Sequence, residues 1–268
     1  MKTMTEKIDK FIINAYATKV RSIVFAILFP TIFNILISMA LIILFGDSYK
    51  IYAVRLQIIA NTILFIILIY VYIRSSKLIY NDIDNNFKVK NIVLILFLGF
   101  SISIFGNTLS NILMKEFNIV EENLTVKAIL NANIVEALLL TCISAPLTEE
   151  IIFRGYIFKT INRYHGFIFS AVISSILFGI SHIFPISILF AFLCGMFLSY
   201  VYYLYKSILM CMILHMMVNL SSLMVHYFLN MDQNRREIYF ILFIAFVLII
   251  MITLRLHIYC KNYTENNN

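Results

Sequence analysis

Charged residues are scarce in this chain. Of its 268 residues, only 13% are Asp, Glu, Lys or Arg, whereas 62% are hydrophobic. A water-soluble globule needs enough polar surface to cover its apolar interior, and this composition does not supply it. The scarcity of charge excludes a soluble protein and predicts an all-α, polytopic integral membrane helical bundle.

Paired cysteines and a basic domain are also missing. The four cysteines are isolated and form no C-x-x-C pair, so they indicate packing residues and neither a disulfide framework nor a metal cluster. The net charge of +7 is spread over short loops, which makes it a topology signal and predicts no nucleic-acid partner.

No loop is long enough to form a soluble domain. We expect a cytoplasmic N-terminal segment at 1–19, a single transmembrane domain at 20–259 and a disordered tail at 260–268. A helix needs about 20 apolar residues to cross about 30 Å of hydrocarbon. About eight transmembrane helices are predicted from the apolar runs near 20–45, 51–73, 91–114, 128–158, 166–183, 184–205, 207–229 and 238–259.

Lys and Arg are concentrated on one side of this arrangement. They cluster in the N-terminal segment, the loop 74–90, a turn at 159–163 and the C-terminal tail. The positive-inside rule then predicts a multi-pass protein of the cell membrane with both termini in the cytoplasm. The abundance of Ile, Asn and Lys indicates a bacterial source.

Two adjacent acids interrupt the fourth apolar run. Glu150 and Arg154 are four residues apart, so they share a helix face with the acid in the favourable N-terminal position. Glu149 lies about 100° around the helix and is free to meet another helix. Charges at this depth are costly and mark a functional site by default.

Other polar groups lie on later spans. His182 follows Phe178 by four residues, and His215 precedes Asn219 by four, so one helix presents His215 and Asn219 on a single stripe. Because such groups are costly when they face hydrocarbon, we expect them to converge on one another or on water. Arg55 and Glu136, by contrast, are predicted to be interfacial or packing groups.

These residues form three motifs on successive apolar segments, namely Glu149-Glu150-x-x-x-Arg154, Phe178-x-x-x-His182 and His215-x-x-x-Asn219. In this order they resemble the CAAX protease and bacteriocin-processing family (CPBP, or Abi). The resemblance covers about 145–225 and includes Pro146 upstream of the first motif. It implies an intramembrane endopeptidase related to the enzyme that trims prenylated CAAX proteins.

Peptide hydrolysis suggests a role for each group. Glu149 is the best base, His182 helps to bind and polarise the water, and His215 and Asn219 donate hydrogen bonds to the oxyanion, as the resemblance also implies. Glu150 and Arg154, with Phe178, support this site by holding the helix that presents Glu149.

Zinc gives a competing version of the site. Glu149, His182 and His215 match catalytic zinc ligands, but Glu150 would then have to act as base while tied to Arg154. The helical H-E-x-x-H arrangement is absent, so a mechanism without a cofactor is favoured over the metalloprotease-like one.

Glu149 and His182 are predicted to lie at different depths in the membrane, which opposes their convergence. At about 1.5 Å per residue, Glu149 lies about 15 Å from Lys159, whereas His182 lies about 24 Å from Gly166. The groups can meet only if the span tilts or if the stretch near Gly166 is not yet membrane-crossing helix. Gly155 and Gly166 are the candidate breaks.

The predicted function is an intramembrane endopeptidase acting on a membrane-tethered, lipidated or hydrophobic peptide. Because bacteria generally lack prenylated CAAX substrates, peptide maturation, bacteriocin immunity or processing of a signalling peptide is the expected task. Two alternatives stay open: a non-catalytic immunity or peptide-binding membrane protein, and a proton-coupled transporter that uses Glu149, His182 and His215 as a relay. The sequence leaves the oligomeric state open.

Overall fold

The described part of the chain is helical and contains no strand. The computed structural model describes residues 29–30, 32–33, 35–37, 39–40, 43–44, 46, 49–75, 89–119, 124–182, 184–228 and 235–266. The predicted segment 1–19 and most of the first apolar run lie outside these residues. Helix is the expected solution because lipid offers no partner to a free backbone N–H or C=O group.

Among the residues that the structure describes, five helices are long and apolar enough to cross a membrane. They are the main parts of α2 (Tyr49–Ser75), α4 (Val89–Glu116), α9 (Pro185–Tyr205), α10 (Ile208–Phe228) and α11 (Arg235–Asn266). Each matches a predicted run, so the all-helical multi-pass membrane architecture is confirmed, while the count of eight is not. Helix α11 continues to Asn266, and so covers most of the tail that the sequence predicted to be disordered. An existing helix extends more easily than a new one nucleates.

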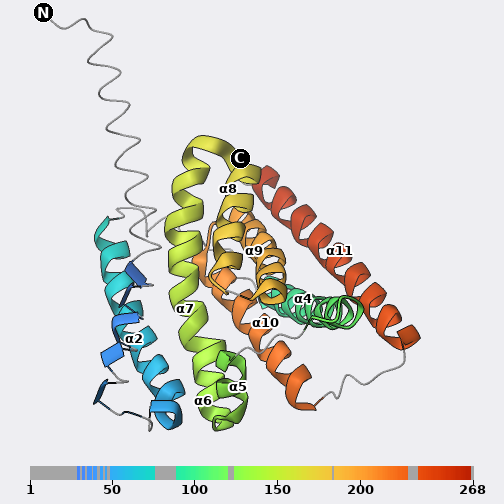
Figure 1. Cartoon of the computed structure of the whole chain (residues 1–268). Helices are drawn as coiled ribbons and strands as arrows, with labels where there is room; N and C mark the ends of the chain where they lie inside the picture. Colours follow the sequence, from blue (N-terminus) through green and yellow to red (C-terminus); the bar gives the residue numbers. More distant parts are fainter. Residues whose placement is uncertain are drawn as a thin grey trace, which may run out of the picture.

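The apolar run that carries the two glutamates forms two helices, a short one followed after a break by a very long one. Short α5 (Leu124–Asn131) ends before Asn133, whose side chain caps the next helix by accepting a hydrogen bond from the Val135 N–H at 2.9 Å. The long helix then continues without interruption through five successive segments (Figure 1). These are α6 (Ile134–Leu138), π-helical η2 (Leu139–Ser144), α7 (Ala145–Glu150), π-helical η3 (Ile151–Phe158) and the start of α8 (Lys159–Ile180).

The chain reverses at Gly166 and not in the predicted turn 159–163. Gly166 has φ 74° and ψ 177°, a conformation open in practice only to glycine, so α8 consists of two helices joined there. Figure 1 shows the chain arching over from the long helix into the second half of α8. Lys159 and Arg163 thus lie on a helix, and the predicted break at Gly166 is confirmed, whereas Gly155 lies inside η3.

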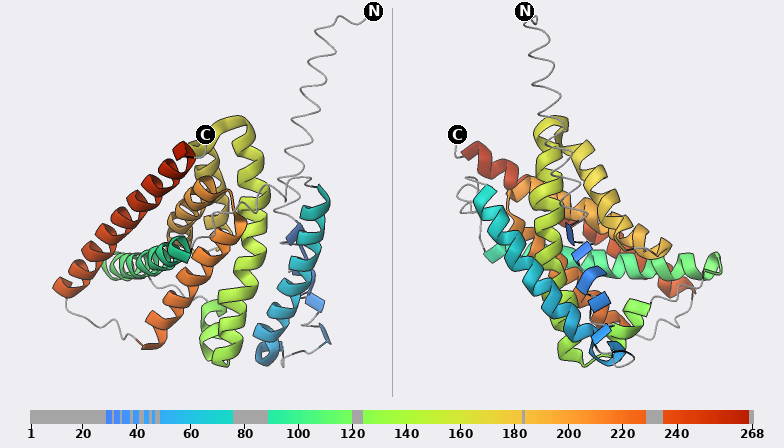
Figure 2. Two further views of the ribbon diagram at one scale, coloured as in Figure 1. Left: turned by 180° about the vertical axis from the view of Figure 1, so that it is seen from behind. Right: turned by 60° about the vertical axis from the view of Figure 1, so that its left-hand side comes forward.

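Two packed units hold the site. The second half of α8 packs against α9, and α4 packs against both α10 and α11. Figure 2 shows α2 beside the long helix and α11 on the outside of the bundle. The core between them is apolar and includes Phe158, Phe178, Leu198 and Leu214, all buried.

Candidate active site

Glu149 and Glu150 lie on α7, between two π-helical segments. A π-helix bonds each N–H to the carbonyl five residues back, and such segments are frequent at functional sites. Each π-segment changes the angular position of every residue that follows it. Relative to the start of the long helix, the rotation of the two glutamates is therefore set by η2, and that of Arg154, which lies within η3, by both segments.

A fully buried ion pair forms the base of the site. Arg154 Nη1 donates to Glu150 Oε1 at 3.1 Å, and both side chains have no exposed surface. Arg154 also donates from Nη2 to the Gly195 carbonyl oxygen at 3.0 Å, and its guanidinium lies 4.8 Å from the centre of the Phe178 ring. The predicted pairing of Glu150 with Arg154 is confirmed.

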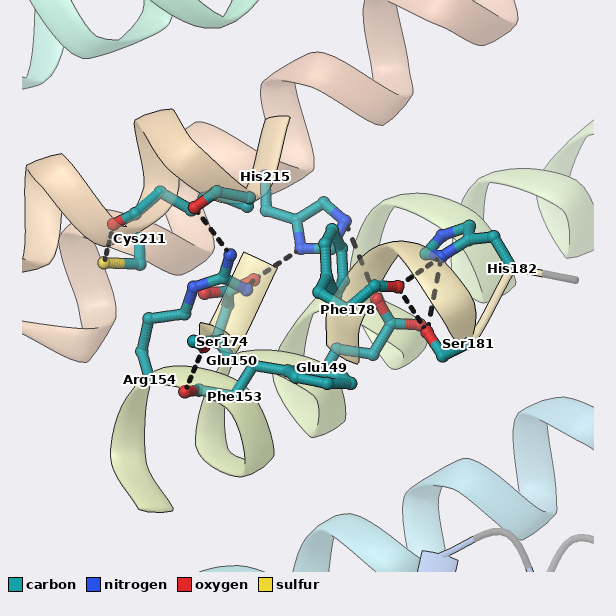
Figure 3. Close-up of polar contacts among 12 residues, drawn as sticks. Glu149, Glu150, Phe153, Arg154, Ser174, Phe178, Ser181, His182, Cys211 and His215 are labelled. Atoms are coloured by element: carbon teal, nitrogen blue, oxygen red, sulfur yellow. Dashed lines mark hydrogen bonds and ion pairs between the residues drawn. The ribbon is translucent and has the colours of Figure 1, made fainter. Parts of the chain in front are cut away.

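His215 lies between the two glutamates (Figure 3). Its Nδ1 is 2.7 Å from Glu150 Oε1, and its Nε2 is 3.8 Å from Glu149 Oε2. The side chain of Glu149 is 30% exposed, whereas that of Glu150 is fully buried. Of the two acids, Glu149 is thus the one that water and a peptide can reach.

His182 lies just beyond the end of α8, in the turn that leads into α9. Its Nδ1 is 2.9 Å from the Phe178 carbonyl oxygen and 3.3 Å from Ser181 Oγ. A carbonyl oxygen only accepts, so Nδ1 carries the hydrogen and Nε2 of the neutral ring is an acceptor. The Phe178 ring lies 5.0 Å from the His182 ring and 5.6 Å from the His215 ring, between centroids. Figure 3 shows the two imidazoles flanking it.

Asn219 lies one turn beyond His215 on α10, as the spacing predicted, but its side chain bonds to a backbone carbonyl of the long helix and not to the glutamates. Its Nδ2 donates to the Thr141 carbonyl oxygen in η2 at 2.8 Å. This bond uses one of the two N–H groups of the amide and ties α10 to the long helix. The structure therefore brings Glu149, Glu150 and His215 into contact and anchors Asn219 beside them.

Two residues at the back of the site were not predicted. Gly195 supplies the carbonyl that anchors Arg154, and a Cβ at Gly195 would lie 3.0 Å from Ser175 Cβ, so a larger residue would require α9 or Ser175 to shift by a few tenths of an ångström. Ser174 Oγ donates to the Phe153 carbonyl oxygen in η3 at 3.0 Å. For Gly195, the signal in the sequence was a glycine inside an apolar span. For Ser174, the sequence carries no such signal.

The zinc alternative requires three donor groups to lie close together. Within the described ranges, no three His, Cys, Asp or Glu side chains are grouped so that they could hold a metal ion. His215 Nδ1 is engaged by Glu150, which leaves one nitrogen on each histidine as a donor to a metal. The set Glu149, His182 and His215 is not assembled as a zinc site in this arrangement, and we derive no step through a metal.

Comparison with known proteins gives a match to a protein family. Residues 131–221 match the family model described as Type II CAAX prenyl endopeptidase Rce1-like. No curated protein and no solved structure matches the chain significantly. The matched segment contains all three polar motifs, from Glu149 to Asn219. By this match the chain is similar to the CAAX prenyl endopeptidases throughout its site, and the predicted resemblance to the CPBP family is confirmed.

Proposed function

We propose that the protein is an intramembrane endopeptidase that hydrolyses a membrane-tethered or hydrophobic peptide. The observation that carries the proposal is the partly exposed Glu149 carboxylate, 3.8 Å from a histidine that a buried carboxylate holds in place. The family match supports a protease-like function of the CAAX type. The apolar helices support a membrane protein whose substrate is membrane-associated.

In this proposal Glu149 activates the hydrolytic water. The carboxylate takes one proton from the water, the water oxygen attacks the peptide carbonyl carbon, and Glu149 returns the proton to the leaving amide nitrogen as the C–N bond breaks. His182 offers Nε2 as an acceptor for the other hydrogen of the water, because its Nδ1 already donates to the Phe178 carbonyl oxygen.

The developing oxyanion needs donors. Asn219 has a second N–H beside the one bonded to Thr141. The Nδ1 hydrogen of His215 is committed to Glu150. His215 can therefore donate to the oxyanion from Nε2 when both ring nitrogens carry a hydrogen. Both groups are proposed to stabilise the tetrahedral intermediate, and the ion pair of Glu150 and Arg154 holds the helix that presents Glu149.

The experiment that tests this function compares the wild type with Glu149→Gln. The purified protein in nanodiscs would be given a library of quenched, lipidated and hydrophobic peptides. We expect Glu149→Gln to lower kcat about 10²- to 10⁴-fold, because general acid–base catalysis contributes that much. Glu136→Gln is the matched control, since it removes an acid from the same long helix at a remote, ion-paired position, and we expect it to keep activity.

A chelator arm decides the role of metal. Activity that survives chelation supports the metal-free mechanism, and activity lost on chelation and restored by zinc supports the zinc alternative. No cleavage by folded wild-type protein would contradict the proposal and favour peptide binding or immunity, in which case Glu149→Gln should keep binding. Flux that depends on a pH gradient would instead favour the transporter.

Orientation belongs to the same proposal. We place both termini in the cytoplasm of a bacterial cell, with the protein in the cell membrane, because most Lys and Arg residues outside the spans lie on that side. Cysteine accessibility labelling at Lys159→Cys and Lys127→Cys in whole cells would check this. We expect Lys127→Cys to react with an impermeant reagent and Lys159→Cys to be protected.

A further inference from the structure

The Glu150 carboxylate receives donors from two different helices. Arg154 Nη1 on η3 reaches Glu150 Oε1 at 3.1 Å, and His215 Nδ1 on α10 reaches the same oxygen at 2.7 Å. Pairing with Arg154 explains the first contact. The second contact is the shorter of the two and joins Glu150 to a residue of the reaction site.

The direction of this hydrogen bond fixes the chemistry of the imidazole. Glu150 Oε1 already accepts a hydrogen bond from the Arg154 guanidinium, so this oxygen serves as an acceptor and His215 Nδ1 carries the hydrogen. The other nitrogen, Nε2, then points to Glu149, with Nε2 and Oε2 3.8 Å apart. A histidine held in this way presents one defined nitrogen to whatever occupies the site.

We propose that Glu150 is the positioning residue of His215, which sets both the tautomer and the orientation of its ring. The consequence for catalysis rests on the proposed function, whereas the tautomer does not. Glu150 touches neither water nor peptide in this scheme, because its side chain is fully buried. Besides pairing with Arg154, it affects the reaction through His215, whose Nε2 it turns toward Glu149 and the substrate.

Glu150 is in turn held in place by Arg154. Arg154 is fixed by its bond to the Gly195 carbonyl oxygen and by the face of the Phe178 ring. The chain of contacts therefore begins on α9, passes through Arg154 and Glu150, and ends at the His215 ring. If Glu150 served only to neutralise Arg154, the orientation of His215 would not depend on it.

The first test uses the wild-type protein and needs no activity. Nitrogen-15 NMR of histidine-labelled protein in nanodiscs, with the signal assigned by its loss in His215→Asn, reports which ring nitrogen carries hydrogen. We expect Nδ1 of His215 to be protonated. A neutral His215 ring protonated on Nε2 alone would overturn the proposal, whatever the protein does to peptides.

The second test compares Glu150→Gln with Glu150→Leu. Both variants leave Arg154 without its negative partner, so the difference between them isolates the acceptor oxygen. Arg154 Nη1 keeps the amide oxygen of the glutamine turned toward His215. We expect Glu150→Gln to keep the Nδ1-protonated ring. We expect Glu150→Leu to lose it, with a further fall in kcat of about 10- to 100-fold at unchanged KM, which is the loss typical of residues that orient a metal-bound histidine through its other ring nitrogen.

The positioning role would be refuted if Glu150→Gln and Glu150→Leu both fold and have the same His215 tautomer and the same kcat. If Glu150→Leu does not fold, the wild-type NMR result decides. A protein that cleaves nothing but shows the Nδ1-protonated His215 would contradict the proposed function and leave the positioning of His215 standing.

Discussion

Replacing Arg154 with methionine tests whether the buried ion pair holds the site together. The substitution keeps much of the side-chain volume but removes the bonds to Glu150 and Gly195 and the contact with the Phe178 ring. It also leaves the Glu150 carboxylate, which has no exposed surface, without its cation. Breaking a buried pair from one side costs about 3–5 kcal/mol, mainly because a charge remains buried without a partner.

The double variant Glu150→Gln with Arg154→Met separates that penalty from the loss of contacts. It removes both charges and keeps an acceptor for His215, and exchanging a whole buried pair for neutral groups is often close to neutral in stability. We therefore expect it to be more stable than Arg154→Met by at least about 2 kcal/mol, within the range of coupling between residues in contact.

The assay is reversible unfolding in mixed micelles, read as the free energy of unfolding. Arg55→Met is the matched control, because Arg55 also pairs with a glutamate, Glu136 at 2.6 Å, but has a side chain that is 59% exposed. Exposed pairs contribute about 0–1 kcal/mol. A loss for Arg154→Met no larger than that for Arg55→Met would refute the reasoning, as would a double variant less stable than the single one.

Three further substitutions test other parts of the site. Gly195→Ala should cost about 1–3 kcal/mol of unfolding free energy because its Cβ would lie 3.0 Å from Ser175 Cβ and Oγ. Ser175→Gly in the same chain removes these two atoms but leaves Cα at 3.1 Å, so it should restore only part of the stability. Gly166→Ala should cost about 1–3 kcal/mol, and Gly166→Asn should not rescue it, because ψ 177° lies outside the left-handed helical region that asparagine tolerates. Asn219→Ala removes the bond to Thr141 and should lower the unfolding free energy by only about 1 kcal/mol. If the amide is an oxyanion donor, the same substitution should lower kcat about 10²- to 10³-fold. An unchanged kcat would show that Asn219 is a packing residue.

The membrane architecture was readable because it depends on composition and length. Apolar runs long enough to cross a bilayer are nearly always helices, and the five helices that satisfy this criterion match predicted runs. The long helix was harder, since its start depends on one capping residue, Asn133, and its end on one glycine, Gly166. Hydrophobicity carries no signal for either boundary, because the helix continues past the apolar run through Lys159 and Arg163.

The sequence predicted that Glu149 meets a group on another helix, as it does at His215, but it predicted which atoms bond only where both residues lie on one helix. The spacing of Glu150 and Arg154 was enough to predict their bond, since residues four apart share a face. The contact between Glu150 and His215 was not predictable, because it depends on how two helices rotate and pack. The π-segments η2 and η3 add to that rotation, and no feature of the residues in them was recognised as a π-helix signal. Asn219 shows the same limit, since its stripe was predicted but its partner Thr141 was not.

The position of Gly166 resolves the mismatch in depth between the first two motifs. Depth measured from Lys159 placed Glu149 nearer the membrane surface than His182, but the first helix does not end at Lys159. It continues to Gly166, which follows Glu149 by 17 residues and precedes His182 by 16. Two antiparallel helices of nearly equal length, about 24 Å each at about 1.5 Å per residue, bring both groups to the same level below the turn. The glycine that reverses the chain thereby sets the level at which the acid and the histidine lie.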